Sequence, residues 1–108
     1  PIAVNFADDV FSKTLPKKFA LHANYPNPFN PSTIIGYDVP HVEDVTIGIY
    51  DLQGRLVRML VNKEQDAGFY ELKWNGRNAF GELVAAGLYF CRMDAGDYWA
   101  VRKMMLVK

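Results

Sequence analysis

From Phe19 to the end of the chain, short runs of β-type residues alternate with turn residues at intervals of about 8 to 12 positions. That spacing is typical of an all-β sandwich, and no segment shows a helix cap followed by three turns of an apolar stripe. The expected strands cover residues 19–23, 33–40, 44–51, 55–61, 68–75, 88–94 and 98–108. The pattern therefore predicts a seven-stranded antiparallel β-sandwich.

Three of these runs place apolar side chains on one face only. The inward positions are expected to be Ile35, Tyr37, Val39, Val45, Ile47, Ile49, Tyr70, Leu72 and Trp74. Gly54 and Gly96 suit turns, because glycine adopts positive φ without a steric penalty. Residues 55–61 also fit helical spacing, but a seven-residue run is short for a helix, so we expect a strand there.

Size and composition limit the classes of function. The 108 residues suffice for one domain with a modest core, and half of them are hydrophobic, unlike those of a disordered chain. Twelve basic residues balance twelve acidic ones, so no net charge draws the chain to nucleic acid or to an anionic membrane. Cys91 is the one cysteine, so packing alone must hold the fold, and no apolar run approaches the roughly 20 residues that span a bilayer.

The N-terminal residues 1–18 differ from the rest, because they mix an alternating stretch with charges and end in Pro-Lys-Lys. We expect an interdomain linker or N-terminal arm there, with an added edge strand as the alternative. The folded domain is expected over residues 19–108. Since the chain starts at Pro1 rather than at methionine, we expect it to be a piece of a longer protein.

Groups that could perform catalysis do not converge in the sequence. His22 and His41 stand far apart and lack the spacing of metal ligands. Cys91 shares a strand face with Tyr89 and Met93, where a cysteine behaves as a small buried hydrophobe. The paired carboxylates are adjacent residues, which point apart on a strand or turn and cannot flank one sugar. We therefore expect no enzyme and no cofactor.

Two loops and three aromatic residues leave binding roles open. Residues 51–55 and 74–82 carry oxygen ligands near glycine, but ordinary turns are the favoured interpretation over a surface Ca²⁺, so no metal is predicted. Phe69, Phe80 and Trp99 are candidates for a carbohydrate or peptide platform, although aromatics also occur in strands because they pack well there.

Residues 24–33, Asn-Tyr-Pro-Asn-Pro-Phe-Asn-Pro-Ser-Thr, form a stiff polar segment. Proline fixes φ near −65° and disfavours the helical region for the residue before it, so this segment is rigid without being a ladder strand. We expect a crossover between the first two strands, with Tyr25 and Phe29 packed over the end of the core.

Several motifs occur together in one order, over residues 19–40, 45–61, 67–93 and 102–108. This set resembles the type A C-terminal sorting domains of type IX secretion substrates, and is equally similar to the related Ig-like domain of the flagellar hook-capping protein. The motif positions that match are Pro26, Asn27 and Pro28, then Gly87 and Tyr89, then Arg102, Lys103 and Lys108 in a basic and hydrophobic ending, and the loop Trp74, Asn75, Gly76, Arg77 and Asn78. Asparagine replaces both aspartates of the hook-capping loop, at positions 75 and 78, so we predict no metal there.

The resemblance implies an Ig-like or fibronectin-III-like sandwich that is a non-catalytic module of a secreted protein. Its implied role is a sorting and cell-surface anchoring signal in a Gram-negative bacterium, with the outer-membrane secretion machinery and an upstream cargo domain as partners. Two alternatives remain, a structural or assembly domain of hook-capping type and a carbohydrate-binding accessory module of a secreted hydrolase. The last strand would offer an unpaired edge for strand addition, with Arg102, Lys103 and Lys108 opposing casual pairing.

Overall fold

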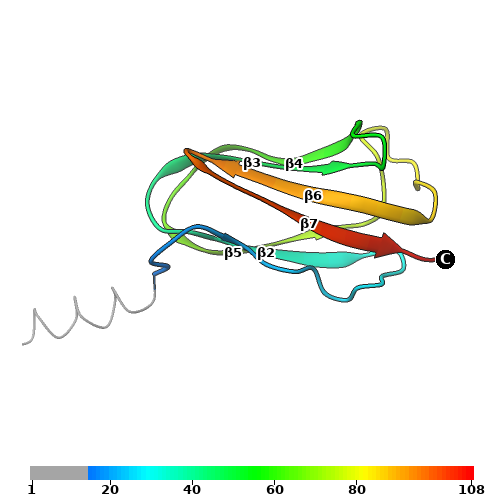
Figure 1. Cartoon of the computed structure of the whole chain (residues 1–108), viewed down its shortest axis with the longest axis horizontal. Helices are drawn as coiled ribbons and strands as arrows, with labels where there is room; N and C mark the ends of the chain where they lie inside the picture. The colour runs from blue at the N-terminus through cyan, green and yellow to red at the C-terminus, as the bar shows by residue number, and fades with distance from the viewer. Residues whose placement is uncertain (1–14) are drawn as a thin grey trace, which may run out of the picture.

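The computed structural model describes residues 15–108, and within them every regular element is a strand. The strands are β1 (Ala20–Leu21), β2 (Thr33–Val39), β3 (Glu43–Tyr50), β4 (Leu56–Gln65), β5 (Gly68–Trp74), β6 (Gly87–Ala95) and β7 (Tyr98–Leu106). One sheet has the order β1-β2-β5 and the other the order β4-β3-β6-β7, with antiparallel pairing throughout. The two sheets face each other across one core, which confirms the predicted seven-stranded sandwich (Figure 1).

The core forms between the inner faces of the sheets, because alternate residues of β2, β3, β6 and β7 point inward. In β2 and β3, the predicted inward positions are buried, from Ile35 to Ile49 along the chain. Trp74 of β5 is also buried, whereas Tyr70 and Leu72 are half-buried because β5 lies at the edge of its sheet. Period-two alternation therefore located the core.

Strand lengths differ most from the prediction in β1 and β4, while the ends of the other strands shift by one or two residues. β1 has two residues rather than five, since its backbone pairs with only Asp38 and Tyr37 of β2 before the chain turns away. β4 runs on to Gln65, because Asn62, Lys63 and Glu64 continue the ladder with β3 despite their polarity. The strand prediction for residues 55–61 is confirmed, and the ladder carries two register shifts, which locally kink this edge strand.

The turns follow the glycine positions. Gly54 has φ +81° after β3, and Gly96 has φ +57° in the β6–β7 hairpin. Both predictions are confirmed. The expected N-terminal linker or arm lies mostly outside the described residues and stays a prediction, as does the domain boundary at residue 19. Within residues 15–108, no helix of a length and hydropathy suited to crossing a membrane is present.

Candidate functional site

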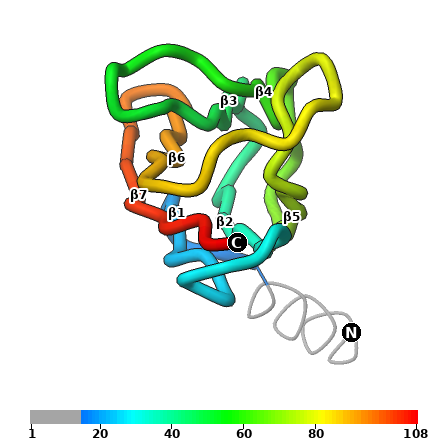
Figure 2. Tube along the Cα trace, turned by 90° about the vertical axis from the view of Figure 1, so that its right-hand side faces the viewer, coloured from blue at the N-terminus to red at the C-terminus, as the bar shows by residue number. Residues whose placement is uncertain are grey.

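The proline-rich segment lies against the C-terminal strand. The backbone N–H of Phe29 donates to the Met105 carbonyl at 2.9 Å, and the N–H of Val107 donates to the Phe29 carbonyl at 2.9 Å. Phe29 thus forms a parallel bridge with Leu106 on the outer edge of β7. Figure 2 shows the red C-terminal end of the chain next to the light-blue to cyan loop that carries these residues.

The Asn27 side chain extends the same contact. Its Oδ1 accepts the Met105 N–H at 3.0 Å, and its Nδ2 donates to the Lys103 carbonyl at 3.4 Å. Since Pro26 and Pro28 have no N–H to offer, the asparagine amide supplies the hydrogen bonds that a strand would supply. The chain is therefore paired on its outer edge from Lys103 in β7 to Val107 just beyond it, and the expectation of an unpaired edge is wrong for these residues.

Two buried polar residues, Asn24 and Thr33, hold the proline-rich segment in place. Thr33 Oγ1 donates to the Pro26 carbonyl at 2.9 Å, and Asn24 Nδ2 donates to Thr33 Oγ1 at 3.0 Å. Asn24 is 5% exposed and Thr33 1% exposed. These bonds tie the proline turn to the first residue of β2, which explains how an irregular stretch is held in one place.

Phe29 and Tyr25 have opposite environments. Phe29 is 1% exposed, and its ring lies 5.7 Å from that of Trp74, as expected for a side chain that closes the end of the core. Tyr25 is 80% exposed, so the expectation that it packs over the core is wrong. Its backbone forms an antiparallel bridge with Ile34, which is itself exposed, and residues that share such a bridge project to the same side of the sheet.

The glycine-tyrosine motif lies on the other side of the same strand. Gly87 pairs with Leu106 and has φ +146°, a backbone conformation that favours glycine. Tyr89 pairs with Met104, is 7% exposed, and donates from its hydroxyl to the Ala85 carbonyl at 2.6 Å. Burial, together with the nearby carboxylate of Asp51, raises the pKa of the Tyr89 hydroxyl. Leu106 therefore lies between one motif on β6 and another at residue 29.

The basic residues of the ending lie on the surface around this contact. Arg102, Lys103 and Lys108 are all exposed. Arg102 Nε donates to the Leu21 carbonyl at 2.8 Å, which joins β7 to β1. The structure thus brings three separate sequence motifs to β7 and its two neighbours, while their role in recognition stays a prediction.

The tryptophan loop satisfies its own polar groups. Asn78 Oδ1 accepts the N–H groups of Phe80 and Glu82 at 2.9 and 3.1 Å, and its Nδ2 donates to Glu82 Oε1 at 3.1 Å. Asn75 Oδ1 accepts the Arg77 N–H at 3.2 Å. The Asn78 amide can donate to the Glu82 carboxylate, whereas an aspartate at position 78 would place two carboxylates in contact.

Two further bonds close this loop. Trp74 Nε1 donates to the Arg77 carbonyl at 2.9 Å, and Arg77 Nη1 donates to the Gly81 carbonyl at 2.7 Å. Gly76 has φ +72°, and a Cβ there would lie 2.8 Å from the Pro31 carbonyl oxygen. Among residues 15–108, no group of three or more His, Cys, Asp and Glu side chains could hold a metal ion.

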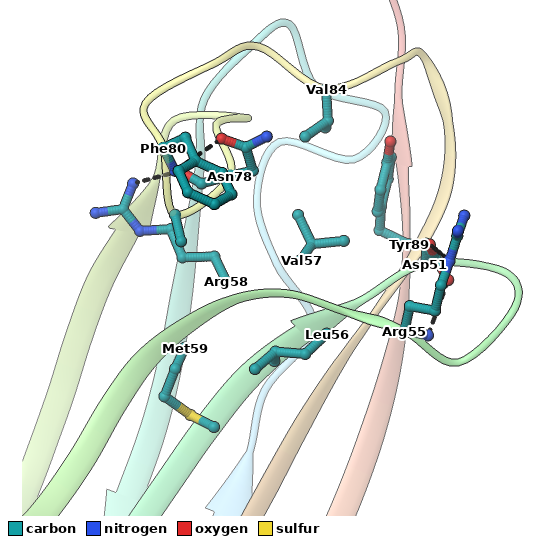
Figure 3. Close-up of a pocket in the computed structure, with 11 residues that line it drawn as sticks. Asp51, Arg55, Leu56, Val57, Arg58, Met59, Asn78, Phe80, Val84 and Tyr89 are labelled. Carbon is teal, nitrogen blue, oxygen red and sulfur yellow. Dashed lines mark hydrogen bonds and ion pairs between the residues drawn. The ribbon is translucent and has the colours of Figure 1, made fainter.

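A cleft of about 740 Å³ lies between this loop and the start of β4. Figure 3 shows Phe80 and Arg58 at one side, Val57 and Val84 toward the middle, and Tyr89 at the other side. Arg58 Nη1 donates to the Asn78 carbonyl at 3.4 Å, and Phe80 is 87% exposed. The sequence did not predict this cleft, because the cleft forms only where the tryptophan loop approaches β4, about 20 residues earlier in the chain.

The polar groups of the cleft already pair with one another. Asp51 accepts backbone N–H groups of Gln53 and Arg55, both at 2.9 Å, and its other oxygen accepts Arg55 Nε at 2.9 Å. The backbone bond from Arg55 is the largest of several contacts that lower the pKa of the Asp51 carboxyl. An ionised carboxylate held in this way is a turn anchor and is poorly suited to proton transfer.

The candidate nucleophile and bases lie apart. Cys91 is buried in the core as expected, and burial raises the pKa of its thiol to about 12. His22 Nε2 lies 3.0 Å from Asp38 Oδ1 on the other sheet, and His41 borders β3. Phe80 and Trp99 are exposed, but Trp99 does not line the cleft that contains Phe80.

Comparison with solved structures identifies the same fold in bacterial surface and flagellar proteins. PorZ of Porphyromonas gingivalis, described as an essential bacterial surface component of the type-IX secretion system, matches with a TM-score of 0.59 and 23% identity over 82% of this chain and 12% of its own. Dimeric latent PorU of the same organism matches with a TM-score of 0.58 and 24% identity over 82% of this chain and 9% of its own. The chain therefore spans only a small part of either protein.

FlgD of Xanthomonas campestris, described in connection with hook capping and flagellar assembly, matches with a TM-score of 0.56 and 24% identity over 81% of this chain and 64% of its own. No curated protein sequence matches the chain. The model of the FlgD Ig-like domain matches residues 32–97, which include β2 to β6 and the tryptophan loop. The chain therefore belongs to the FlgD Ig-like domain family.

Proposed function

We propose that this chain is a non-catalytic sorting module of a secreted protein and directs its cargo to the cell surface through a type IX secretion system. The observation that carries the proposal is the meeting of three sorting-type motifs at β7. Asn27 and Phe29 bind its outer edge, Gly87 and Tyr89 pair with its inner edge, and the basic ending surrounds them. The likeness to PorZ, a surface component of such a system, supports this placement.

The positions of the reactive groups support a role without catalysis. The Cys91 thiol lies in the core with a pKa of about 12, so it stays protonated at neutral pH and cannot act as a nucleophile. His22 pairs with Asp38 of β2, and Cys91 lies in β6 of the other sheet. We further propose the outer-membrane secretion machinery and a cargo domain on the same chain as its partners.

Deleting residues 102–108 would be an ambiguous test. Met104 and Leu106 are 0% and 1% exposed, so the truncation would open the core and block export through misfolding alone. Substituting exposed side chains avoids this problem, because surface substitutions usually change the free energy of unfolding by no more than about 0.5 kcal/mol.

The test fuses a reporter to the 108-residue chain in a bacterium with a type IX system. The wild-type fusion is expected at the cell surface or in the medium, and the Lys103→Gln/Lys108→Gln fusion in the periplasm. A Lys63→Gln/Lys73→Gln fusion is the matched control, because both lysines are exposed but lie on β4 and β5. Retention of the wild-type fusion in the periplasm would contradict the proposal.

A second candidate is an assembly domain of hook-capping type, supported by the family match over residues 32–97 and by the likeness to FlgD. This function predicts that the domain contacts other domains or copies of its own protein. Replacing it with an unrelated sandwich would then reduce the oligomer size of the parent protein in light scattering and leave export unchanged. The reverse result would favour sorting.

A further inference from the structure

A pocket of about 630 Å³ opens where the chain enters the sandwich, between the residues before β1, the β2–β3 loop and β7. Three rings form one wall. Phe19 stacks on Tyr98 with ring centres 5.6 Å apart, and His41 meets Phe19 edge-on at 5.3 Å. The wall is partly apolar, which suits a ligand that has a hydrocarbon portion.

The backbone of Leu21 orients two hydrogen-bond donors of this pocket. Leu21 N–H donates to the Tyr98 hydroxyl oxygen at 3.0 Å, and the Leu21 carbonyl accepts Arg102 Nε at 2.8 Å. The Tyr98 hydroxyl donates to no other described residue, and both terminal nitrogens of Arg102 are without a hydrogen-bond partner among these residues. A planar guanidinium fork and a hydroxyl are thus held beside each other as donors.

The ionisable groups that line the pocket are bases or the Tyr98 phenol. Lys17, Lys18 and Arg102 line it together with His41, and no carboxylate within residues 15–108 is among its lining residues. None of the ion pairs between described residues uses Lys17, Lys18 or Arg102. The acidic neighbours, Glu43 and Asp97, line a second hollow that shares the ring wall. Among the described residues, the lining of this pocket therefore carries a net positive charge.

We propose that this pocket binds carboxylate side chains of an acidic peptide from a partner protein. A guanidinium with two free terminal nitrogens matches the two oxygens of a carboxylate, and such charge-assisted bonds are roughly twice as strong as neutral ones. The ring wall contacts the methylene groups of the same side chains, and Lys17 and Lys18 extend the attraction to a second carboxylate. The proposal does not depend on the export role, since any acidic partner would meet the same donors.

The test measures binding of a fluorescent peptide with four consecutive aspartates to the 108-residue chain by anisotropy, with the four-asparagine peptide as reference. We expect the aspartate peptide to bind and the asparagine peptide not to bind. Arg102→Gln should weaken binding at least about tenfold, because it removes the guanidinium that pairs with both oxygens of a carboxylate. Lys73→Gln is the matched control, since Lys73 is exposed on β5 and does not line the pocket.

Tyr98→Phe should weaken binding several-fold, but it also removes the acceptor of the Leu21 N–H and can lower stability. The Lys17→Gln/Lys18→Gln variant keeps the measurement decisive, because both side chains are exposed and neither makes a hydrogen bond within the described residues. It should weaken binding without changing the melting temperature. Equal binding of both peptides, equal effects of Arg102→Gln and Lys73→Gln, or full displacement by equimolar inorganic phosphate would overturn the proposal.

Discussion

Replacing Phe29 with alanine tests whether the proline-rich segment belongs to the core. Phe29 is 1% exposed and packs beside Trp74, so the substitution removes a whole buried ring. Burial of this extent places the loss of unfolding free energy in the range of about 3–5 kcal/mol. Because the residue closes the end of the sandwich, where neighbours can partly collapse into the gap, we expect about 3 kcal/mol.

That loss is a large fraction of the total, since a domain of this size is stable by about 5–15 kcal/mol. A change of 1 kcal/mol shifts the melting temperature of a 60–100-residue domain by about 4–8 °C, so we expect a decrease of about 12–24 °C. The backbone bonds between residue 29 and β7 survive the substitution. The measured loss therefore reports ring burial rather than loss of the edge contact.

Urea unfolding of the 108-residue chain, followed by circular dichroism and tryptophan fluorescence, gives the free energy and its slope. Tyr25→Ala is the matched control, because Tyr25 lies in the same segment but is 80% exposed, so the substitution removes an aromatic ring that is not buried. It should change stability by no more than about 0.5 kcal/mol. A loss below about 1 kcal/mol for Phe29→Ala, or equal losses for both variants, would refute the burial argument.

Three further predictions concern the β7 edge, the tryptophan loop and the core. Asn27→Ala should cost about 1–2 kcal/mol in urea unfolding, because it removes two side-chain bonds to β7, whereas Asn30→Ala should be neutral; equal effects would contradict the edge contact. Asn78→Asp should lower the melting temperature at low salt, because it places a second carboxylate beside Glu82, and high salt should reduce this loss by screening the repulsion; a loss that does not depend on salt would exclude repulsion at this contact. Cys91 should resist alkylation by iodoacetamide in the native state even at pH 9, because its thiol is buried with a pKa of about 12, and rapid labelling without urea would show that the core opens there.

The sequence predicted the inner faces of the strands because burial imposes period two on each of them. The run at 55–61 also fits helical spacing, so its short length decided the prediction of a strand, and the structure places it in β4 at the edge of its sheet. Its continuation to Gln65 was not predictable, because polar residues join a ladder when the partner strand is long enough.

The candidate site was predictable only as separate motifs. Nothing in the order of residues shows that Asn27 bonds to Met105, since 78 positions separate them and an amide on an irregular segment has no periodic signal. The same holds for Leu21, whose backbone orients Tyr98 and Arg102 across the gap between the two sheets. Family resemblance named some of these residues, and the structure supplies the physical reason for placing them together.

Pairing of the β7 edge changes how a partner can recognise the end of this chain. A strand could add freely only over residues 99–101, because Asn27 and Phe29 already bind positions 103–107. Displacing that segment would expose the Phe29 ring and forfeit about the same 3 kcal/mol as its removal. Recognition by side chains carries no such cost, since Lys103 and Lys108 already face solvent. A sorting machine that binds the folded domain should therefore lose affinity when these charges are removed and keep it when Phe29 is replaced by leucine.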